Sequence, residues 1–298
     1  MNQLKQHLAA LRLLLVMTVV TGVLYPLAVT AVAQMPGLRS RADGSLITVG
    51  GKIVGSKLLG QAFTGKDGNA LVQYFQSRPS AAGAGAGYDP NASGASNLGP
   101  ESIADILPDP KTRGDSGTQR LLTQVCSRSK AIGALEGVDG MRPYCTPGGV
   151  GAVLAVFYAG PGYAGTVTRV VSVNEACPAA PFISSFKGVK VECGKFGEDY
   201  SKGQIIPIRG NFTSTPAVPA DAVTASGSGL DPQISPAYAR LQVARVAKAR
   251  GATGQQVQTL VVSYTTGRGF GFLGEPAINV LELNLALDRQ YPQHPHHQ

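Results

Sequence analysis

Four cysteines are the side chains of this sequence best suited to covalent chemistry. They lie at Cys126, Cys145, Cys177 and Cys193, an even number without a C-x-x-C spacing or a nearby histidine. This pattern indicates two disulfide bonds rather than a metal or redox site. Three pairings are possible, and the short loops between sequence neighbours favour Cys126–Cys145 with Cys177–Cys193. Four buried, reduced thiols are the alternative.

Histidine is confined to the two ends of the chain, at His7, His294, His296 and His297. An interior without histidine excludes a Ser-His or Cys-His catalytic pair inside a folded domain, and it excludes the common zinc sites that need His. The C-terminal histidines lie in residues 290–298, which we predict to be a disordered tail rather than a chelating site. The sequence therefore predicts no catalytic residues and no metal site.

The run Ser226-Gly227-Ser228-Gly229 is the remaining candidate for ligand chemistry. Consecutive small residues allow backbone amides to form an anion-binding nest, so these four residues are the candidate nucleotide contact. The alternative is a tight loop that leads to a helix N-cap, with Asp231 and Ser235 satisfying free amides. A hydrolase based on Ser226 or Ser228 would need a lysine base, because the interior lacks histidine.

The first structural element that the sequence predicts is a helix over an uncharged stretch of 21 residues, Leu13–Ala33. As a helix it is about 31 Å long, which matches the hydrocarbon core of a bilayer. Pro26 is expected to kink or weaken its last two turns. A cleaved signal peptide is the alternative, since Ala31–Ala33 fits a cleavage site, but the stretch exceeds the usual core of a signal.

Small and hydroxyl residues inside this stretch, Thr18, Thr21 and Gly22, are of the kind that lets helices approach closely in lipid. We predict that they form a partner-binding face. All four cysteines follow the stretch, and disulfides persist outside the cytoplasm. Residues 1–12 are therefore predicted to be cytoplasmic, residues 13–33 to span the cell membrane once, and the bulk to be extracytoplasmic.

The extracytoplasmic part is predicted to be an α+β domain in two stretches, residues 34–100 and 220–289. Between them, residues 101–219 form a β-rich insert that carries all the cysteines. Its expected strands are apolar and β-branched, and they cover Val150–Tyr158, Thr166–Val173, Val189–Glu192 and Gln204–Ile208. A small hairpin is expected over Ile47–Val54.

Helix signals are concentrated in the second stretch. Ser235-Pro236 is an N-cap followed by proline, and the helix is expected to end at Gly251. Thr253 and Gln256 form a capping box, and apolar residues from Val257 onward recur at helical spacing. The segment Ala277–Leu287 is ambiguous between strand and helix.

Charge argues against nucleic-acid binding. The net charge is +8, but no run of lysine or arginine is interleaved with aromatic residues. Charged residues make up only 15% of the chain, against about 25% in a typical protein, which excludes a long solvated coiled coil.

The chain resembles the C subunit of the Kdp potassium-transporting P-type ATPase. The resemblance covers residues 4–100 and 219–289 in order, and the insert lies outside it. The matching motifs are Thr21–Leu27, Gly44–Ile47, Val54–Ser56, Leu59–Gln61, Tyr74-Phe75, Arg78–Ser80, Ala92–Pro100, Val223–Pro232, Gln242–Gly251 and Phe272–Asp288.

The resemblance implies an accessory subunit that assembles with a potassium channel-like subunit, a P-type ATPase subunit and a small F subunit. It also implies a catalytic chaperone that raises the nucleotide affinity of the ATP-hydrolysing subunit, with ATP bound together with that partner and no cofactor of its own. In agreement, the sequence has no Asp-Lys-Thr-Gly-Thr phosphorylation motif. The alternative function is a secreted, disulfide-bonded binding module with a cleaved signal peptide.

Overall fold

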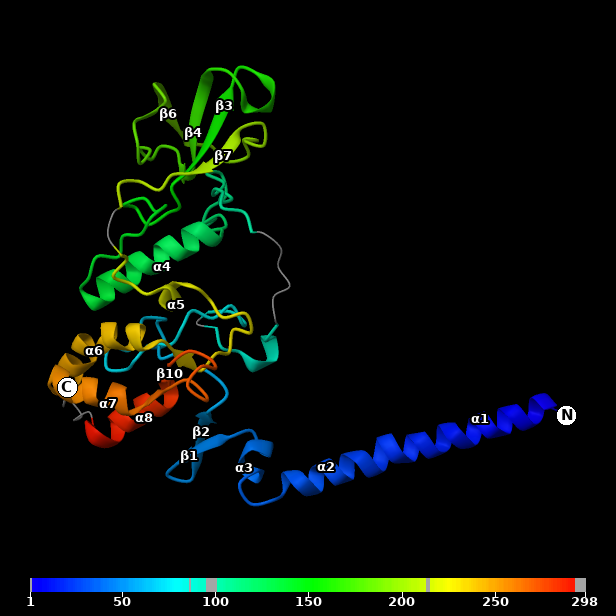
Figure 1. The fold of residues 1–298 in the computed structure, drawn as a ribbon. Coiled ribbons are helices and arrows are strands. Elements are labelled where there is room, and N and C mark those ends of the chain that lie inside the picture. The colour runs from blue at the N-terminus through cyan, green and yellow to red at the C-terminus, as the bar shows by residue number, and fades with distance from the viewer. Residues whose placement is uncertain (1, 86, 95–100, 213–214, 293–298) are drawn as a thin grey trace. The chain divides into compact units, whose positions relative to one another are not determined.

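The computed structural model describes residues 2–85, 87–94, 101–212 and 215–292, and it divides the chain into two compact units (Figure 1). Unit 1 comprises residues 1–59 and unit 2 comprises residues 60–298. The expected tail falls mostly on residues 293–298, which lie outside the described part of the chain.

Unit 1 is dominated by one long helical segment. The α-helix α1 (Asn2–Val19) continues through a turn of π-helix, η1 (Val20–Leu24), into α2 (Tyr25–Ala33). The most apolar 18-residue window of the helix Gln3–Ala33 has a mean hydropathy of 2.1 and is not buried, so the helix is long and apolar enough to cross a membrane. Pro26 lies in the first turn of α2, directly after the π-turn, so the irregularity in this helix precedes the proline and the helix continues to Ala33.

A short helix and a hairpin complete unit 1. The helix α3 (Arg39–Ala42) precedes β1 (Leu46–Val49) and β2 (Lys52–Ser56), which pair antiparallel as predicted. Gly50 and Gly51 form the turn with φ values of +57° and +78°, the left-handed pair that a type I′ hairpin needs.

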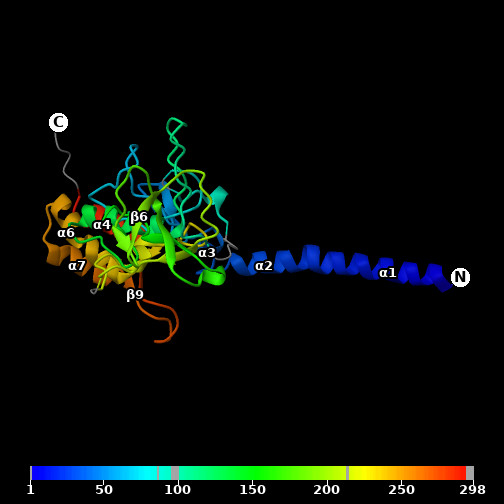
Figure 2. The same cartoon turned by 90° about the horizontal axis from the view of Figure 1, so that it is seen from above.

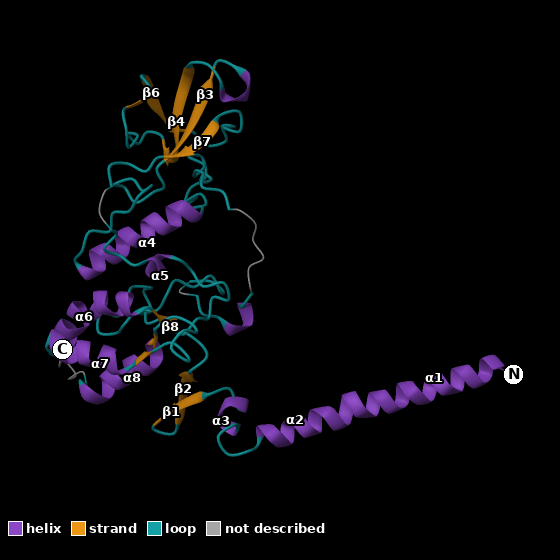
Figure 3. Ribbon diagram, in the orientation of Figure 1, coloured by secondary structure: helices purple, strands orange, loops and turns teal. Residues whose placement is uncertain are grey.

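The core of unit 2 is built by three helices and a small sheet, and Figure 3 shows the helices side by side. The helices are α6 (Pro236–Arg250), α7 (Gly254–Ser263) and α8 (Val280–Gln290). The antiparallel sheet has the order β8 (Gln233–Ile234), β10 (Ala277–Asn279) and β9 (Thr265–Thr266).

The predicted helix ends are confirmed, and they explain where these helices start. The Ser235 hydroxyl accepts from the Tyr238 N–H at 3.0 Å, Gly251 ends α6 in the left-handed conformation, and Thr253 and Gln256 form the expected capping box. The ambiguous segment is both strand and helix: β10 ends at Asn279, whose side chain caps α8 by accepting from the Glu282 N–H.

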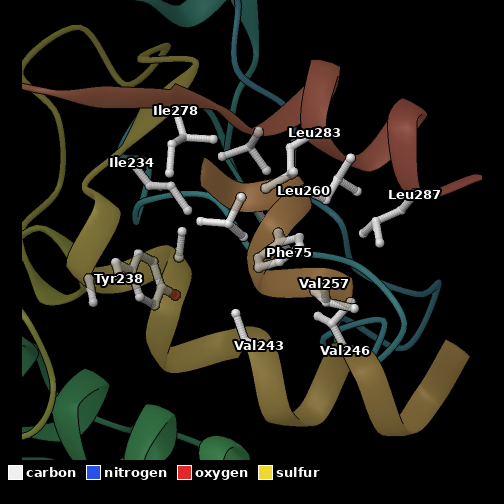
Figure 4. Close-up of a cluster of buried hydrophobic side chains, with 14 of the residues drawn as sticks. Phe75, Ile234, Tyr238, Val243, Val246, Val257, Leu260, Ile278, Leu283 and Leu287 are labelled. Atoms are coloured by element: carbon white, nitrogen blue, oxygen red, sulfur yellow. The ribbon is translucent and has the colours of Figure 1, made fainter. Parts of the chain in front are cut away.

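Apolar side chains from these elements meet in one cluster (Figure 4). Phe75, which comes from the first stretch of the chain, is fully buried among side chains of α6, α7 and α8. The Asn284 side chain fixes it by accepting from the Phe75 N–H at 2.9 Å and donating to the Phe75 carbonyl at 3.0 Å. The first predicted stretch is therefore divided: residues 34–59 belong to unit 1, and the part from Gly60 onward shares one core with the second stretch.

The insert contains the sheet that the sequence predicts. Its order is β5-β6-β4-β3-β7, with β4 and β6 parallel and the other pairs antiparallel. The four long runs proposed from the sequence all appear as strands, and β5 was not predicted. The strand bounds are β3 (Val153–Tyr158), β4 (Val167–Ala176), β5 (Ser185–Phe186), β6 (Val189–Gly194) and β7 (Gln204–Pro207).

The insert also contains a helix that the sequence analysis missed, α4 (Leu121–Glu136). It packs against α5 (Ala220–Val223) and α6, outside the insert, and its partly buried Val125 and Ile132 contact the helical core. Residues 101–219 are therefore a sheet plus a helix that belongs to the core of unit 2. Short 3-10 turns lie at η2 (Pro90–Ala92) and η3 (Pro161–Tyr163).

The cysteines lie at disulfide distance in two pairs, Cys126 with Cys145 and Cys177 with Cys193, at Cα–Cα separations of 5.5 and 5.1 Å. These are the pairs that the short loops favoured. The first ties α4 to the loop before β3, and the second ties the end of β4 to β6. The described residues contain no free cysteine, so the reduced-thiol alternative has no support.

Candidate functional site

The Ser226–Gly229 loop follows α5 and is held by charged and hydroxyl side chains from residues 78–88. The Arg78 guanidinium pairs with the Asp231 carboxylate at 2.8 Å and donates to the Thr224 carbonyl at 3.2 Å. The Ser80 hydroxyl donates to the Gly229 carbonyl at 2.6 Å. We had expected Asp231 to satisfy free backbone amides, but its carboxylate instead pairs with Arg78 and so holds the loop. Ser235 does cap the N-terminus of α6, as predicted.

Two of the four backbone amides of this loop, those of Ser226 and Gly229, are used inside the protein, as is the amide of the next residue, Leu230. The Ser226 N–H donates to the Pro79 carbonyl at 3.4 Å, the Gly229 N–H to the Ser226 carbonyl at 3.2 Å, and the Leu230 N–H to the Ser228 hydroxyl at 3.1 Å. An anion-binding nest needs several amides that converge on free space. This geometry favours the tight-loop interpretation over the nest.

Close packing explains why one of the loop glycines is needed. Gly229 has a φ of +73°, and a Cβ added there would lie 2.5 Å from the Cβ of Ala82. A Cβ at Gly227 would meet nothing within 4 Å. The sequence Ser-Gly-Ser-Gly thus combines one obligatory glycine with one that the fold does not require.

A cavity of about 320 Å³ borders the loop, and Ser226, Gln124 and Arg128 are among its lining residues. The Ser226 hydroxyl is buried and has no hydrogen-bond partner among the described residues. Arg128 reaches in from α4, donates to the Val223 carbonyl at 3.1 Å, and has its pKa lowered by burial. Among the described lining residues none is lysine or histidine, so a Ser226 hydrolase would lack its base.

A second cavity, of about 220 Å³, lies next to the first, and Arg78, Tyr88, Arg128 and Tyr238 help to line it. The Tyr88 hydroxyl donates to the Arg78 carbonyl at 2.8 Å, and burial raises the pKa of Tyr88 to about 12. The sequence analysis missed Arg78, Tyr88 and Arg128. The Arg-Pro-Ser motif could have indicated the first, but Arg128 lies on a helix that was not predicted.

Two ion pairs elsewhere in unit 2 join helices of the body. Arg245 pairs with Glu136 at 3.0 Å, and both side chains are at most 8% exposed. Arg250 pairs with Asp288 at 2.8 Å. Burial raises the pKa of Glu136, while Arg245 acts in the opposite direction. These pairs join helices, so they stabilise the body rather than serve a ligand.

An apolar tip projects from unit 2 between β9 and β10, and Figure 2 shows this orange segment leaving the body. Phe270, Phe272 and Leu273 are 91%, 71% and 53% exposed. The tip is a closed turn in which Gly269 and Leu273 exchange backbone hydrogen bonds at 2.8 Å, and Arg268 pairs with Glu275 at its base. Clustered, exposed apolar side chains on a closed loop are typical of an interaction site.

The predicted partner face of the long helix consists of residues that bond only to their own helix. The Thr18 hydroxyl donates to the Leu14 carbonyl at 2.8 Å, and the Thr21 hydroxyl donates to the Met17 carbonyl at 2.7 Å. A Cβ added at Gly22 would meet nothing within 4 Å. The three residues therefore leave a surface without outward-facing hydroxyl donors.

These features define the class of the protein: an α+β body, held by internal ion pairs and two disulfides, that follows one helix long and apolar enough to cross a membrane. The sequence profile of the KdpC family, the c chain of the K+-transporting ATPase, matches residues 7–107 and 203–289. The chain therefore belongs to the KdpC family.

Full-length relatives support this assignment. The chain is 38% identical over 291 residues to the potassium-transporting ATPase KdpC subunit of Kineococcus radiotolerans, covering 98% of this chain and 97% of the relative. It is 37% identical to the subunit of the same name from Rhodospirillum rubrum, covering 95% of each chain. The relative from Mycobacterium tuberculosis is 35% identical, covering 96% of this chain and 98% of its own. These alignments run across residues 101–219, which the family profile largely omits.

Proposed function

We propose that this chain is an accessory subunit that stabilises the potassium-transporting ATPase complex and raises the nucleotide affinity of its ATP-hydrolysing subunit. The observation that carries the proposal is where charged and apolar side chains lie on the chain. Ion pairs of the body, such as Arg245–Glu136 and Arg250–Asp288, join its own helices, while apolar side chains are exposed on the long helix and on the tip. Such a chain is built to hold partners rather than to carry out chemistry.

The topology that we propose places residues 1–12 in the cytoplasm and the body outside. The two disulfides within unit 2 support it, because such bonds persist in oxidising compartments. In this orientation the body and the cytoplasmic ATP are on opposite sides of the membrane. Coupling to nucleotide affinity then runs through the membrane helix and through the contact that the body makes with a partner.

A direct contact of ATP with Ser226–Gly229 is the second candidate mechanism. The unpartnered Ser226 hydroxyl beside Arg128 favours it, and the internal use of the loop amides disfavours it. The pair of substitutions Ser226→Ala and Ser228→Ala separates the two mechanisms. We expect the KM for ATP of the complex to remain unchanged, whereas a raised KM with normal recovery of all subunits would establish the direct contact.

The partners that we propose are a channel-like subunit, a P-type ATPase subunit and a small F subunit. The test is recovery of these chains with the affinity-tagged full chain in mild detergent, together with the KM for ATP of complexes with and without it. We expect co-purification, and a higher KM when the chain is missing. A chain that purifies alone, with an intact mass that starts at Gln34, would instead establish the secreted module.

The part of the membrane helix in assembly is tested by filling its small positions, with the changes Thr18→Leu, Thr21→Leu and Gly22→Leu. Insertion should persist because apolarity rises, and partner recovery should fall because close packing is lost. The matched control fills three other positions of the same span, with the changes Val16→Leu, Val20→Leu and Val23→Leu. Equal recovery for both triple variants would show the helix to be an inert tether.

A further inference from the structure

The junction between η1 and α2 has fewer backbone donors than acceptors, and the Thr21 carbonyl is one of those left without a donor. In η1 the hydrogen bonds run from residue i+5 to residue i, and the Tyr25 N–H donates to the Val20 carbonyl. The Thr21 carbonyl could accept from residue 25 in α-helical register or from residue 26 in π-helical register. The Tyr25 N–H is already used, and residue 26 is a proline, which has no N–H.

Side chains of the same helix do not fill this gap. Threonine hydroxyls are the natural donors, but Thr18, Thr21 and Thr30 donate to the carbonyls of Leu14, Met17 and Pro26. Within the described residues no side chain is bonded to the Thr21 carbonyl. The acceptor is therefore vacant in the chain taken by itself.

The position of this carbonyl makes the vacancy costly. Thr21 lies well inside the uncharged stretch Leu13–Ala33, none of which is buried by the rest of the chain. In the hydrocarbon region no water is at hand, so an unpaired carbonyl must find its donor on protein. Gly22 follows it, and because a Cβ there would point into open space, the glycine keeps the adjacent backbone accessible to a neighbouring helix.

We propose that the Thr21 carbonyl accepts a hydrogen bond, inside the membrane, from a polar side chain on a transmembrane helix of a partner subunit. The partner group is an O–H or N–H donor such as serine, threonine or asparagine at the depth of Thr21. This inference rests on the proposed function, because it requires that the membrane helix contacts a partner. It adds a directional contact to the packing face formed by Thr18, Thr21 and Gly22.

The test restores the missing donor from within the helix. Pro26→Ala supplies an N–H at position 26. In π-helical register it bonds to the Thr21 carbonyl, and in α-helical register it bonds to the Gly22 carbonyl and frees the Tyr25 N–H for Thr21, so in either case the partner's donor loses its acceptor. Membrane insertion should be retained, and association with the partner subunits should weaken roughly threefold to thirtyfold, the range for one interhelical hydrogen bond. The control is Pro36→Ala, which removes a proline beyond the span and should leave recovery unchanged.

A spectroscopic readout separates the hydrogen bond from a change in helix shape. The full chain is labelled with carbonyl-13C threonine and 15N glycine, which selects four Thr-Gly junctions at Thr21, Thr64, Thr253 and Thr266. The Thr21 signal is the one that Gly22→Ala removes. In solid-state NMR we expect it to move downfield when the chain in bilayers assembles with its partners. The unassembled Pro26→Ala chain should show the same downfield position.

Each outcome bears on a different claim. Wild-type recovery of the partners with an unmoved Thr21 signal, or undiminished recovery for Pro26→Ala, would overturn this inference and leave the proposed function intact. Failure of the wild-type chain to recover any partner would overturn the proposed function, and the inference with it.

Discussion

Removing the Glu136 carboxylate should cost this protein a large part of its stability. Glu136 ends α4, and both of its carboxylate oxygens accept from the Arg245 Nε at 3.0 Å. The two side chains are 1% and 8% exposed, so Glu136→Ala would leave a guanidinium buried without its counter-charge. Breaking a buried pair from one side costs about 3–5 kcal/mol, out of about 5–15 kcal/mol for a typical domain.

The assay is thermal unfolding of the full chain in detergent, followed by near-ultraviolet circular dichroism with the disulfides intact. For a unit of this size the loss corresponds to a Tm lower by roughly 6–20 °C. The matched control is Glu192→Ala, which breaks an ion pair with Arg169 whose side chains are 46% and 32% exposed. Exposed pairs contribute about 0–1 kcal/mol, so the control should change the Tm little.

Equal and small shifts for the two variants would refute this reasoning. They would show that α4 is not held to α6 by the pair and that residues 101–219 can be separated from the core. A large shift for Glu136→Ala alone would establish that an insert helix is part of the core. Any deletion of the insert should then keep α4 and remove only the sheet.

Three further predictions test the loop and the tip. Burial raises the pKa of Tyr88 to about 12, so the buried, protonated hydroxyl favours the folded state. This contribution to stability should be lost as the pH rises from 10 through about 12. Tyr88→Phe should therefore flatten that part of the pH profile of the denaturation midpoint. Gly229→Ala should destabilise unit 2 by about 1–3 kcal/mol in urea unfolding, whereas Gly227→Ala, which meets nothing within 4 Å, should be near neutral. Phe270→Ser should leave the Tm unchanged, because the ring is 91% exposed, and should lower partner recovery in detergent; a lowered Tm with normal recovery would assign the ring a structural role.

Local features of unit 2 could be predicted because their physical causes are local. A serine before a proline, a glycine after a turn with Lys248 and Arg250, and a Thr-x-x-Gln box each satisfy helix ends with residues only a few positions away. The four long strands of the insert could also be predicted, since β-branched runs bounded by glycine need no distant partner to be recognised. The apolar span and its length follow from composition alone.

What the sequence left ambiguous depended on contacts between distant residues. The helix α4 has no capping side chain at its N-terminus and little amphipathic pattern, and its contacts with α5 and α6 come from residues about 100 positions away. The change from strand to helix at Asn279 depends on β10 pairing with both β8 and β9. Neither cause is visible within a short window of sequence.

The sequence by itself determined the apolar stretch long enough to cross a membrane, the helix ends, the main strands and the resemblance to one family, because each of these depends on residue type and spacing. Only the tertiary structure showed which of the Ser226–Gly229 amides are hydrogen-bonded, that Arg78 braces this loop, and that Arg128 reaches it from the insert. The physical reason is that a polar group is free or satisfied only relative to its neighbours in space. Which neighbours it has is settled by the packing of segments far apart in the chain.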